Sequence, residues 1–304
     1  MASLVWLITG CTSGSGLALV HAIAARGDKV IATGRDATSR LAGLAVEKKD
    51  SIAVLDLDVT APLAEIQSVI AHAVTIFGGL DVLVNNAGVM RMAGIEEASE
   101  AFIQHMFDIN VFGAIKTTQA VLPHMRAAKR GTVVFIGAGL GWAPLPFFTY
   151  YSLTKAALTM FAEGLQKEVA PLGLRSVIFE PGGFESRLAA PRDGEPSGGK
   201  PNVEDYLPLF GKIFGGGRPQ MQGDITKLPD TIIDVVKGEG LAKGRPLPMR
   251  VILGPDALDV IRQKCSEQLE MIDAWEDVTL STMLEGRRET PRGLLKSCSV
   301  MSNN

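Results

Sequence analysis

Short apolar runs and amphipathic stretches alternate along this chain of 304 residues. The run at residues 4–8 is continuous and ends at glycine, which is typical of a strand buried on both faces of a parallel sheet. Comparable runs occur at residues 29–33, 51–57, 81–88, 131–136, 174–179 and 249–253, and the run at 81–88 ends in a polar turn. Helical spacing is found at residues 17–26, 64–77, 102–125, 151–170, 203–214, 230–236 and 256–283. The alternation predicts βαβ units in an α/β protein.

A glycine-rich turn joins the first predicted strand to the first predicted helix. In a strand–turn–helix–strand setting, such a turn lets the backbone approach a pyrophosphate at the helix N-terminus. The segment therefore predicts a dinucleotide-binding site in preference to a merely tight turn. Its candidate binding residues are Gly10, Thr12, Ser13, Gly14, Ser15 and Gly16.

The ends of the next two strands offer groups for the adenosine half of a dinucleotide. Arg35 follows the second strand, where an arginine accommodates a 2′-phosphate and an acidic residue takes a 2′-hydroxyl. Arg35 favours NADP(H), while Asp36, one place late for the acidic role, leaves NAD(H) as the second choice. Asp58 follows the third strand, where its carboxylate can accept from the adenine amino group, cap the helix that starts near Pro62, or do both.

Tyr151 and Lys155 are the candidate catalytic pair. They are four residues apart in a predicted helix and so lie on one face. We expect the ammonium group to lower the pKa of the phenol, which could then exchange a proton with a carbonyl or alcohol oxygen. Alone the pair could be a chance arrangement on a solvated face, but it follows the dinucleotide signals in the right order. Asn110, inside a predicted helix, indicates a bend, a held water or a tolerated polar position.

Composition argues against several classes of partner. The net charge is −3 with a pI near 5.9, and no basic run suggests nucleic acid or an anionic membrane surface. Three distant cysteines, Cys11, Cys265 and Cys298, predict a reducing compartment without a disulfide framework or a metal site. No apolar stretch approaches the roughly 20 residues that span a bilayer, and the N-terminal run is too short for a signal peptide. We therefore expect a soluble, cytoplasmic protein.

The amino-acid composition of the chain changes in its last third. Glycine and proline crowd residues 187–248, where we predict a substrate lid that becomes ordered on binding, with a plain surface insertion as the alternative. Residues 254–286 predict a C-terminal helical extension, and the polar tail at 287–304 predicts disorder. Without a second dinucleotide signature, residues 1–286 are expected to form a single domain.

The ordered motifs resemble those of the short-chain dehydrogenase/reductase family, in particular its 17β-hydroxysteroid-dehydrogenase-like branch. They are TGxxxGxG at 9–16, the Asp58–Val59 pair, NNAG at 85–88, Asn110, YxxxK at 151–155 and PGGF at 181–184. The resemblance spans residues 3–186. It implies a doubly wound Rossmann-type domain with a mostly parallel seven-stranded sheet and helices on both faces. It also implies a homo-oligomer, a dimer or tetramer, for which residues 102–125 are a candidate interface.

The resemblance also implies roles for individual residues. Tyr151 would be the general acid/base, Lys155 would hold the nicotinamide ribose and lower the tyrosine pKa, and Asn110 would hold a water of the proton relay. The further cofactor contacts that it implies are Val59, Asn86, Ala87, Gly88, Pro181, Gly182, Phe184 and Ser186.

Ala138 breaks the pattern, because it stands thirteen residues before Tyr151, where the family has its catalytic serine. No serine or threonine at residues 136–141 replaces the missing hydroxyl. The loss of one such donor typically lowers the rate by about 10²–10³-fold. A deliberate serine-to-alanine replacement explains why every other motif is intact, and it is the explanation we favour. The alternative is a native alanine in a protein with a different use for the cofactor.

We expect an NADP(H)-dependent oxidoreductase that interconverts a ketone and a secondary alcohol on an apolar, ring-sized substrate. The alternatives are a non-redox protein on the same fold (a rearrangement, cyclisation or isomerisation) and a ligand binder without catalysis. The candidate pocket residues, each of which could instead pack in the core, are Met90, Met92, Trp142, Phe147, Phe148, Phe184, Tyr206 and Phe210.

Overall fold

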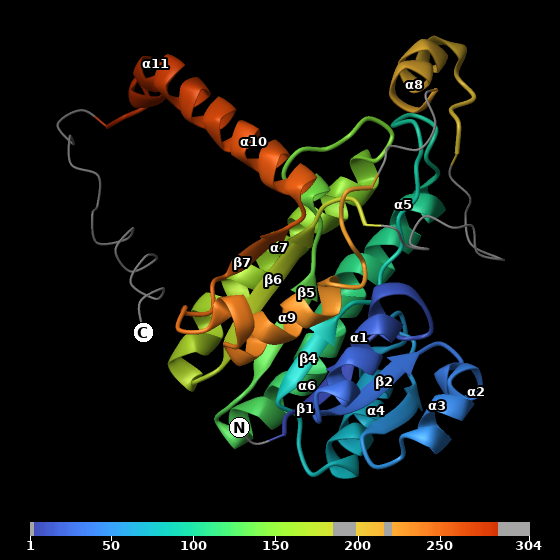
Figure 1. Cartoon of the computed structure of the whole chain (residues 1–304). Helices are drawn as coiled ribbons and strands as arrows, with labels where there is room; N and C mark the ends of the chain where they lie inside the picture. The colour runs from blue at the N-terminus through green and yellow to red at the C-terminus, as the bar shows by residue number, and fades with distance from the viewer. Residues whose placement is uncertain (1–2, 185–198, 216–220, 285–304) are drawn as a thin grey trace.

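A computed structural model of the chain describes residues 3–184, 199–215 and 221–284 (Figure 1). Its strands form a single sheet in the order β3-β2-β1-β4-β5-β6-β7, and every neighbouring pair is parallel. The predicted α/β class and seven-stranded sheet are thereby confirmed. The strands are β1 (Val5–Ile8), β2 (Lys29–Gly34), β3 (Ile52–Asp56), β4 (Val82–Asn85), β5 (Thr132–Ile136), β6 (Arg175–Pro181) and β7 (Arg250–Leu253).

Helices cover both faces of the sheet, as the doubly wound arrangement requires. One face carries α1 (Gly14–Ala25) and α9 (Leu228–Lys237), and the other carries α4 (Leu63–Ile76), α6 (Ala114–Ala128) and α7 (Thr149–Val169). The remaining α-helices are α2 (Ala37–Arg40), α3 (Ala42–Glu47), α5 (Glu100–Phe107), α8 (Leu207–Phe214), α10 (Pro255–Ala274) and α11 (Glu276–Leu280). Short 3-10 turns, of which η2 (Gly139–Gly141) borders the site, complete the framework.

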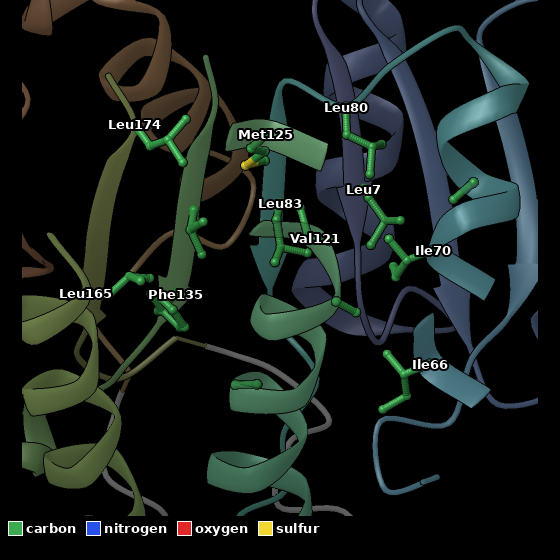
Figure 2. Packing of buried hydrophobic residues seen from close by; sticks show 14 of the residues in the cluster. Leu7, Ile66, Ile70, Leu80, Leu83, Val121, Met125, Phe135, Leu165 and Leu174 are labelled. Atoms are coloured by element: carbon green, nitrogen blue, oxygen red, sulfur yellow. The ribbon is translucent and has the colours of Figure 1, made fainter. Parts of the chain in front are cut away.

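Two apolar layers hold the helices to the sheet. In the layer shown in Figure 2, Leu7, Leu83 and Phe135 project from the strands toward Ile70 of α4 and Val121 of α6. All five side chains are fully buried. The alternating side chains of the same strands build the second layer against α1 and α9. Continuous apolar runs were therefore the correct signature of strands buried on both faces.

The sheet reverses its winding direction between β1 and β4. The chain passes from β1 outward to β2 and β3, and then returns to place β4 on the other side of β1. At such a switch point the loops leaving the two strands diverge and open a crevice outside their carboxyl ends. The glycine-rich turn follows β1 and the Asn85–Gly88 turn follows β4, so both motifs border this crevice.

Three details of the predicted elements need correction. The single helix expected at 102–125 is divided into α5, a π-helix at Asp108–Gly113 and α6. The short helices α2 and α3 follow Asp36, where no helix was predicted. Helix α9, assigned to the lid, packs its apolar side against the sheet beside α1. The predicted C-terminal helical extension is present as two helices, α10 and α11, which project away from the sheet (Figure 1). Residues 185–198, 216–220 and 285–304 lie outside the described parts, so the whole of the tail predicted at 287–304 stays untested.

Within the described residues, no helix is both long and apolar enough to cross a bilayer, and no cluster of His, Cys, Asp or Glu side chains has the arrangement of a metal site.

Candidate active site

A cleft of about 1840 Å³ runs along the carboxyl ends of the strands, from the glycine-rich turn to the start of α10. Pockets for one drug-sized molecule usually measure about 300–1,000 Å³, so this cleft has room for a dinucleotide and a second molecule. The predicted site residues that line it are Gly10, Thr12, Ser13, Gly14, Ser15, Arg35, Asp58, Val59, Asn86, Ala87, Gly88, Met90, Met92, Ala138, Phe148, Tyr151, Lys155, Pro181, Gly182, Phe184 and Phe210.

The glycine-rich turn fits the backbone cradle of a pyrophosphate. Gly10 has φ of +71°, and a Cβ there would lie 2.8 Å from the Cα of Ala87. Gly14 has φ of +60° and begins α1, and a Cβ there would meet no atom within 4 Å. Gly16 does not line the cleft; a Cβ at this position would lie 2.5 Å from the Asn86 side chain. Two glycines thus allow tight packing, while the third presents an open helix N-terminus to the cleft.

Asn86 fastens this turn to the end of β4. Its Nδ2 donates to the carbonyl oxygens of Thr9 at 2.8 Å and Gly10 at 3.2 Å. Its Oδ1 accepts from the hydroxyl of Ser15 at 2.9 Å, and its backbone N–H donates to the Thr9 hydroxyl at 3.1 Å. Asn86 thus joins the ends of β1 and β4. The same bonds fix the shape of the floor on which a dinucleotide would lie.

The adenosine end of the cleft carries two arginines. Arg35 lines it as predicted, and Arg40 of α2 is a second lining residue that the sequence did not suggest, because α2 itself was not expected. Asp36 has φ of +51°, caps α2 and does not line the cleft. Asp58 does line it, but its Oδ1 caps a turn at Thr60 rather than α4, accepting from the backbone N–H at 2.8 Å and the hydroxyl at 2.7 Å.

Tyr151 and Lys155 lie in the first two turns of α7, and both line the cleft while being almost fully buried. The Lys155 Nζ is 5.6 Å from the centroid of the tyrosine ring and donates to the carbonyl oxygen of Ile136 at 2.7 Å. Asn110 lies behind them, outside the cleft lining, and its side chain exchanges two hydrogen bonds with the backbone of Val89. Its Nδ2 also donates to the hydroxyl of Thr154 at 3.0 Å, which ties the π-helix to α7.

The pKa values of the pair differ from the expectation in one respect. Burial raises the pKa of the Tyr151 phenol above its ordinary value, opposite to the lowering that we expected from Lys155. Burial also lowers the pKa of Lys155 to about 8, because the charged ammonium is disfavoured away from water. In this structure, burial is therefore the dominant influence on the pKa of the Tyr151 phenol.

Ala138 occupies the end of β5 and faces the same part of the cleft. Its methyl group is 7% exposed and packs in one apolar cluster with Tyr151 and Val89. The backbone there is extended, with φ of −165° and ψ of 151°, so a serine fits without strain. The position thus has the geometry of a donor site but lacks the hydroxyl.

An aromatic group from α8 closes the apolar end of the cleft. Phe147 lies behind it with φ of +70°, and its ring centroid is 5.4 Å from that of Phe210 and 6.3 Å from that of Phe214. The Phe214 ring also contacts Phe148 at 6.2 Å, and Phe148, Phe210 and Phe214 all line the cleft. Phe147 itself does not line it. Of the predicted lid, α8 reaches the site, and so do Met221, Ile225 and Leu228.

Besides Phe147, two predicted pocket residues lie outside the cleft. The Trp142 indole N–H donates to the buried carboxylate of Glu180 at 2.9 Å. The Tyr206 hydroxyl donates to Glu96 at 2.7 Å and its ring packs edge-on against Phe147. Each side chain found a hydrogen-bond partner in the protein, which sequence position alone could not reveal. Ser186, the remaining predicted contact, lies outside the described residues.

The cleft also has lining residues that the sequence did not suggest. Asp256 and Ala257 come from the start of α10, and the Asp256 carboxylate accepts from the backbone N–H of Gly183 at 2.6 Å. A Cβ on Gly182 would lie 2.2 Å from that carboxylate, so this glycine is needed for the contact. His105 of α5 and Leu145 line the cleft as well. The one indication in the sequence that α10 borders the cleft was its position directly after the end of β7 along the chain.

Comparison with known proteins decides the family. A family model described as short chain dehydrogenase matches residues 4–196, more than half of the chain. The chain belongs to this family. The narrower resemblance to the 17β-hydroxysteroid-dehydrogenase-like branch stays a prediction.

Relatives across the whole length agree with membership of the short-chain dehydrogenase family. Oxidoreductase BOA17 from Botryotinia fuckeliana is 30% identical over 281 residues, which cover 91% of this chain and 98% of that protein. The crystal structure of a short-chain dehydrogenase from Streptomyces avermitilis is 33% identical, covers 93% of this chain and 100% of its own, and superposes with a TM-score of 0.79. A serine dehydrogenase in complex with NADP+ is 26% identical, with coverage of 83% and 95% and a TM-score of 0.68.

Proposed function

We propose that this protein is a cytoplasmic, NADP(H)-dependent oxidoreductase that interconverts a ketone and a secondary alcohol on an apolar, ring-sized substrate. The observation that carries the proposal is one continuous cleft lined by a glycine-rich turn, Arg35, the Tyr151–Lys155 pair and an aromatic wall. When bound, the nicotinamide supplies or accepts the hydride. A ring-sized substrate fits the end of the cleft bordered by Phe148, Phe210 and Phe214.

The residues of the cleft fit the parts of the dinucleotide in order. Gly10 to Ser15 would hold the pyrophosphate, and Arg35 and Arg40 would bind the 2′-phosphate. Asp58 would accept from the adenine amino group, Lys155 would hold the nicotinamide ribose, and the Pro181–Gly182 turn would border the nicotinamide. The preference for NADP(H) over NAD(H) is supported by the two arginines and by the NADP+ complex of the 26%-identical serine dehydrogenase.

Tyr151 is the proposed proton donor and acceptor at the substrate oxygen. Its phenol carries the proton that would be donated as a carbonyl is reduced, and because burial raises its pKa, the phenol is a weaker acid than an exposed tyrosine. Asn110 supports this arrangement by holding Thr154, whose hydroxyl donates to the Tyr151 carbonyl oxygen at 2.7 Å. At Ala138 no hydroxyl polarises the substrate oxygen, so we propose that the activity is reduced, as after a serine-to-alanine replacement.

Ala138 alone favours a second candidate, a non-redox protein that binds NADP(H). In one version it catalyses a rearrangement, cyclisation or isomerisation, and in the other it binds ligands without catalysis. It predicts tight NADPH binding without NADPH consumption. Under the ligand-binding version, a Tyr151→Phe variant keeps its biological activity.

The test follows the loss of NADPH absorbance with a panel of cyclic ketones, for the chain as it stands and for Ala138→Ser. We expect slow turnover in the first and faster turnover in the second. A Tyr151→Phe variant of each is the matched control. Silence across the panel in both proteins, together with measured NADPH binding, would favour the second candidate.

We also propose a homo-oligomer. Phe112 lies in the interface predicted at 102–125 and is 45% exposed, and Leu153 and Met160 of the neighbouring helix α7 are 50% and 58% exposed. Light scattering after size exclusion should give the mass of a dimer or tetramer. A monomer at micromolar concentration would contradict this.

A further inference from the structure

Glu180 is a fully buried carboxylate that the proposed chemistry does not use. It precedes Pro181 at the end of β6, and none of its side chain is exposed. Its Oε2 accepts from the Trp142 indole N–H at 2.9 Å, and its Oε1 accepts from the Thr159 hydroxyl at 3.0 Å. A buried acid of this kind is costly unless its hydrogen bonds are made, so its partners indicate its use.

Each partner belongs to a segment that borders the candidate active site. Trp142 directly follows η2, the turn that leaves Ala138. Thr159 lies one helical turn after Lys155, and its hydroxyl is also 3.0 Å from the Lys155 carbonyl oxygen. Glu180 itself adjoins the Pro181 turn. One carboxylate therefore connects the β5 end, the catalytic helix and the β6 end.

The η2 turn is closely packed on the catalytic helix. A Cβ on Gly141 would lie 3.2 Å from the carbonyl carbon of Lys155, so a shift of the turn is transmitted to the helix backbone. A Cβ on Gly137 would lie 3.2 Å from the Cγ of Glu180, so the end of β5 also rests on this side chain.

Arg250 of β7 lies beside both Trp142 and Glu180. Its guanidinium carbon lies 4.5 Å from the centroid of the Trp142 ring, and its Nη1 is 3.9 Å from the Glu180 carboxylate. Its Nε donates to Glu163 of α7. The single guanidinium thus faces two carboxylates and an indole, which holds the tryptophan ring in place over the buried acid.

We propose that Glu180 is a positioning residue, which sets the relative placement of Ala138, the Tyr151–Lys155 helix and the Pro181 turn by binding Trp142 and Thr159. The kinetic part of this inference rests on the proposed function. Trp142, expected in the substrate pocket, acts through Glu180 instead. None of the three side chains lines the cleft, so the effect is indirect.

The test compares Glu180→Ala and Glu180→Gln, with Glu168→Ala on the exposed side of α7 as the matched loss of a carboxylate. The glutamine can accept from Trp142 and donate to Thr159, because the Thr159 hydroxyl proton can turn to the Lys155 carbonyl oxygen. The readouts are the near-UV circular dichroism of Trp142, isolated by subtracting the Trp142→Phe spectrum, the affinity for NADPH, and kcat and KM for the best ketone.

We expect Glu180→Ala to change the Trp142 signal and to lower kcat on the order of 10²-fold, with a smaller change in KM, since misplacement by about 1 Å has effects of that size. Glu180→Gln should keep the Trp142 signal and restore kcat to near the parent value, and Glu168→Ala should change neither. If the alanine variant fails to fold, Thr159→Val and Trp142→Phe each remove one donor and should each lower kcat in part.

An unchanged Trp142 signal and kcat in Glu180→Ala would overturn the inference, and so would a Glu180→Gln variant as impaired as the alanine variant. If neither the parent protein nor the Ala138→Ser variant turns over a ketone, the proposed function fails. The Trp142 spectrum and the NADPH affinity of the same variants still decide whether Glu180 positions the site.

Discussion

Replacing Ala138 by serine adds one hydroxyl at the part of the cleft where Tyr151 lies. The site accepts the change, because the Ala138 methyl already faces the cleft and its extended backbone suits any residue. We therefore expect the variant to fold as the parent does.

The magnitude follows from the role of a single donor at the substrate oxygen. Such a donor is typically worth about 10²–10³ in kcat, or about 2.7–4 kcal/mol of barrier height. Because the hydrogen bond strengthens as charge develops on the oxygen, the gain should fall on kcat and leave KM nearly unchanged. The buried environment of Tyr151 and Ala138, 3% and 7% exposed, favours the upper half of that range.

The assay is steady-state NADPH oxidation with the ketone that the parent protein reduces best. Ala138→Gly is the matched control, since it changes the same position without adding a donor. We expect about a hundredfold gain or more for serine and none for glycine, with the gain lost in an Ala138→Ser, Tyr151→Phe double variant. A serine variant within about threefold of the parent would refute the reasoning and indicate a site adapted to alanine.

Three further predictions concern the cofactor, the fold and the pH dependence of stability. Arg35→Ala should weaken NADPH binding about 10–100-fold in a fluorescence titration while changing NADH binding little, and equal losses for both would contradict the 2′-phosphate role. Asp28→Ala should lower the free energy of unfolding by about 3 kcal/mol in urea, because it leaves the Trp6 N–H without its acceptor and the Lys237 ammonium with only Glu239, at 3.7 Å; a loss below about 1 kcal/mol would contradict this. Burial lowers the pKa of Lys155 from 10.5 to about 8, so between these values the unfolded chain binds more protons than the folded one, and stability rises with pH. From pH 8 to 10.5 the free energy of unfolding of the parent should rise by about 3 kcal/mol more than that of Lys155→Met. An equal change with pH in both proteins, measured by urea unfolding, would contradict the shift.

The sheet and most of the cofactor side of the cleft could be predicted from the sequence, because their signals are local. A strand buried on both faces appears as a continuous apolar run, and the backbone cradle requires glycine at Gly10 and Gly14, where φ is positive. Tyr151 and Lys155 fall on one helical face for the same local reason.

What the sequence could not predict depends on contacts between distant segments. The position of Trp142 in the sequence predicted a pocket residue, but its indole N–H donates to Glu180, 38 residues further along the chain. Helix α9 has an apolar face that fits the core as well as a lid, and only its packing against α1 distinguishes the two. The raised pKa of Tyr151 likewise depends on the depth of its burial, which spacing from Lys155 does not encode.

The most direct test of the central claim follows the hydride itself. NADPH carrying deuterium at C4 of the nicotinamide, on each face in turn, is incubated with the best ketone and the Ala138→Ser variant, and the alcohol is examined by mass spectrometry. The account predicts one deuterium on the carbinol carbon from one face only, and none when Tyr151 is also replaced by phenylalanine. Alcohol formed without deuterium from either face, or the same yield without Tyr151, would contradict it.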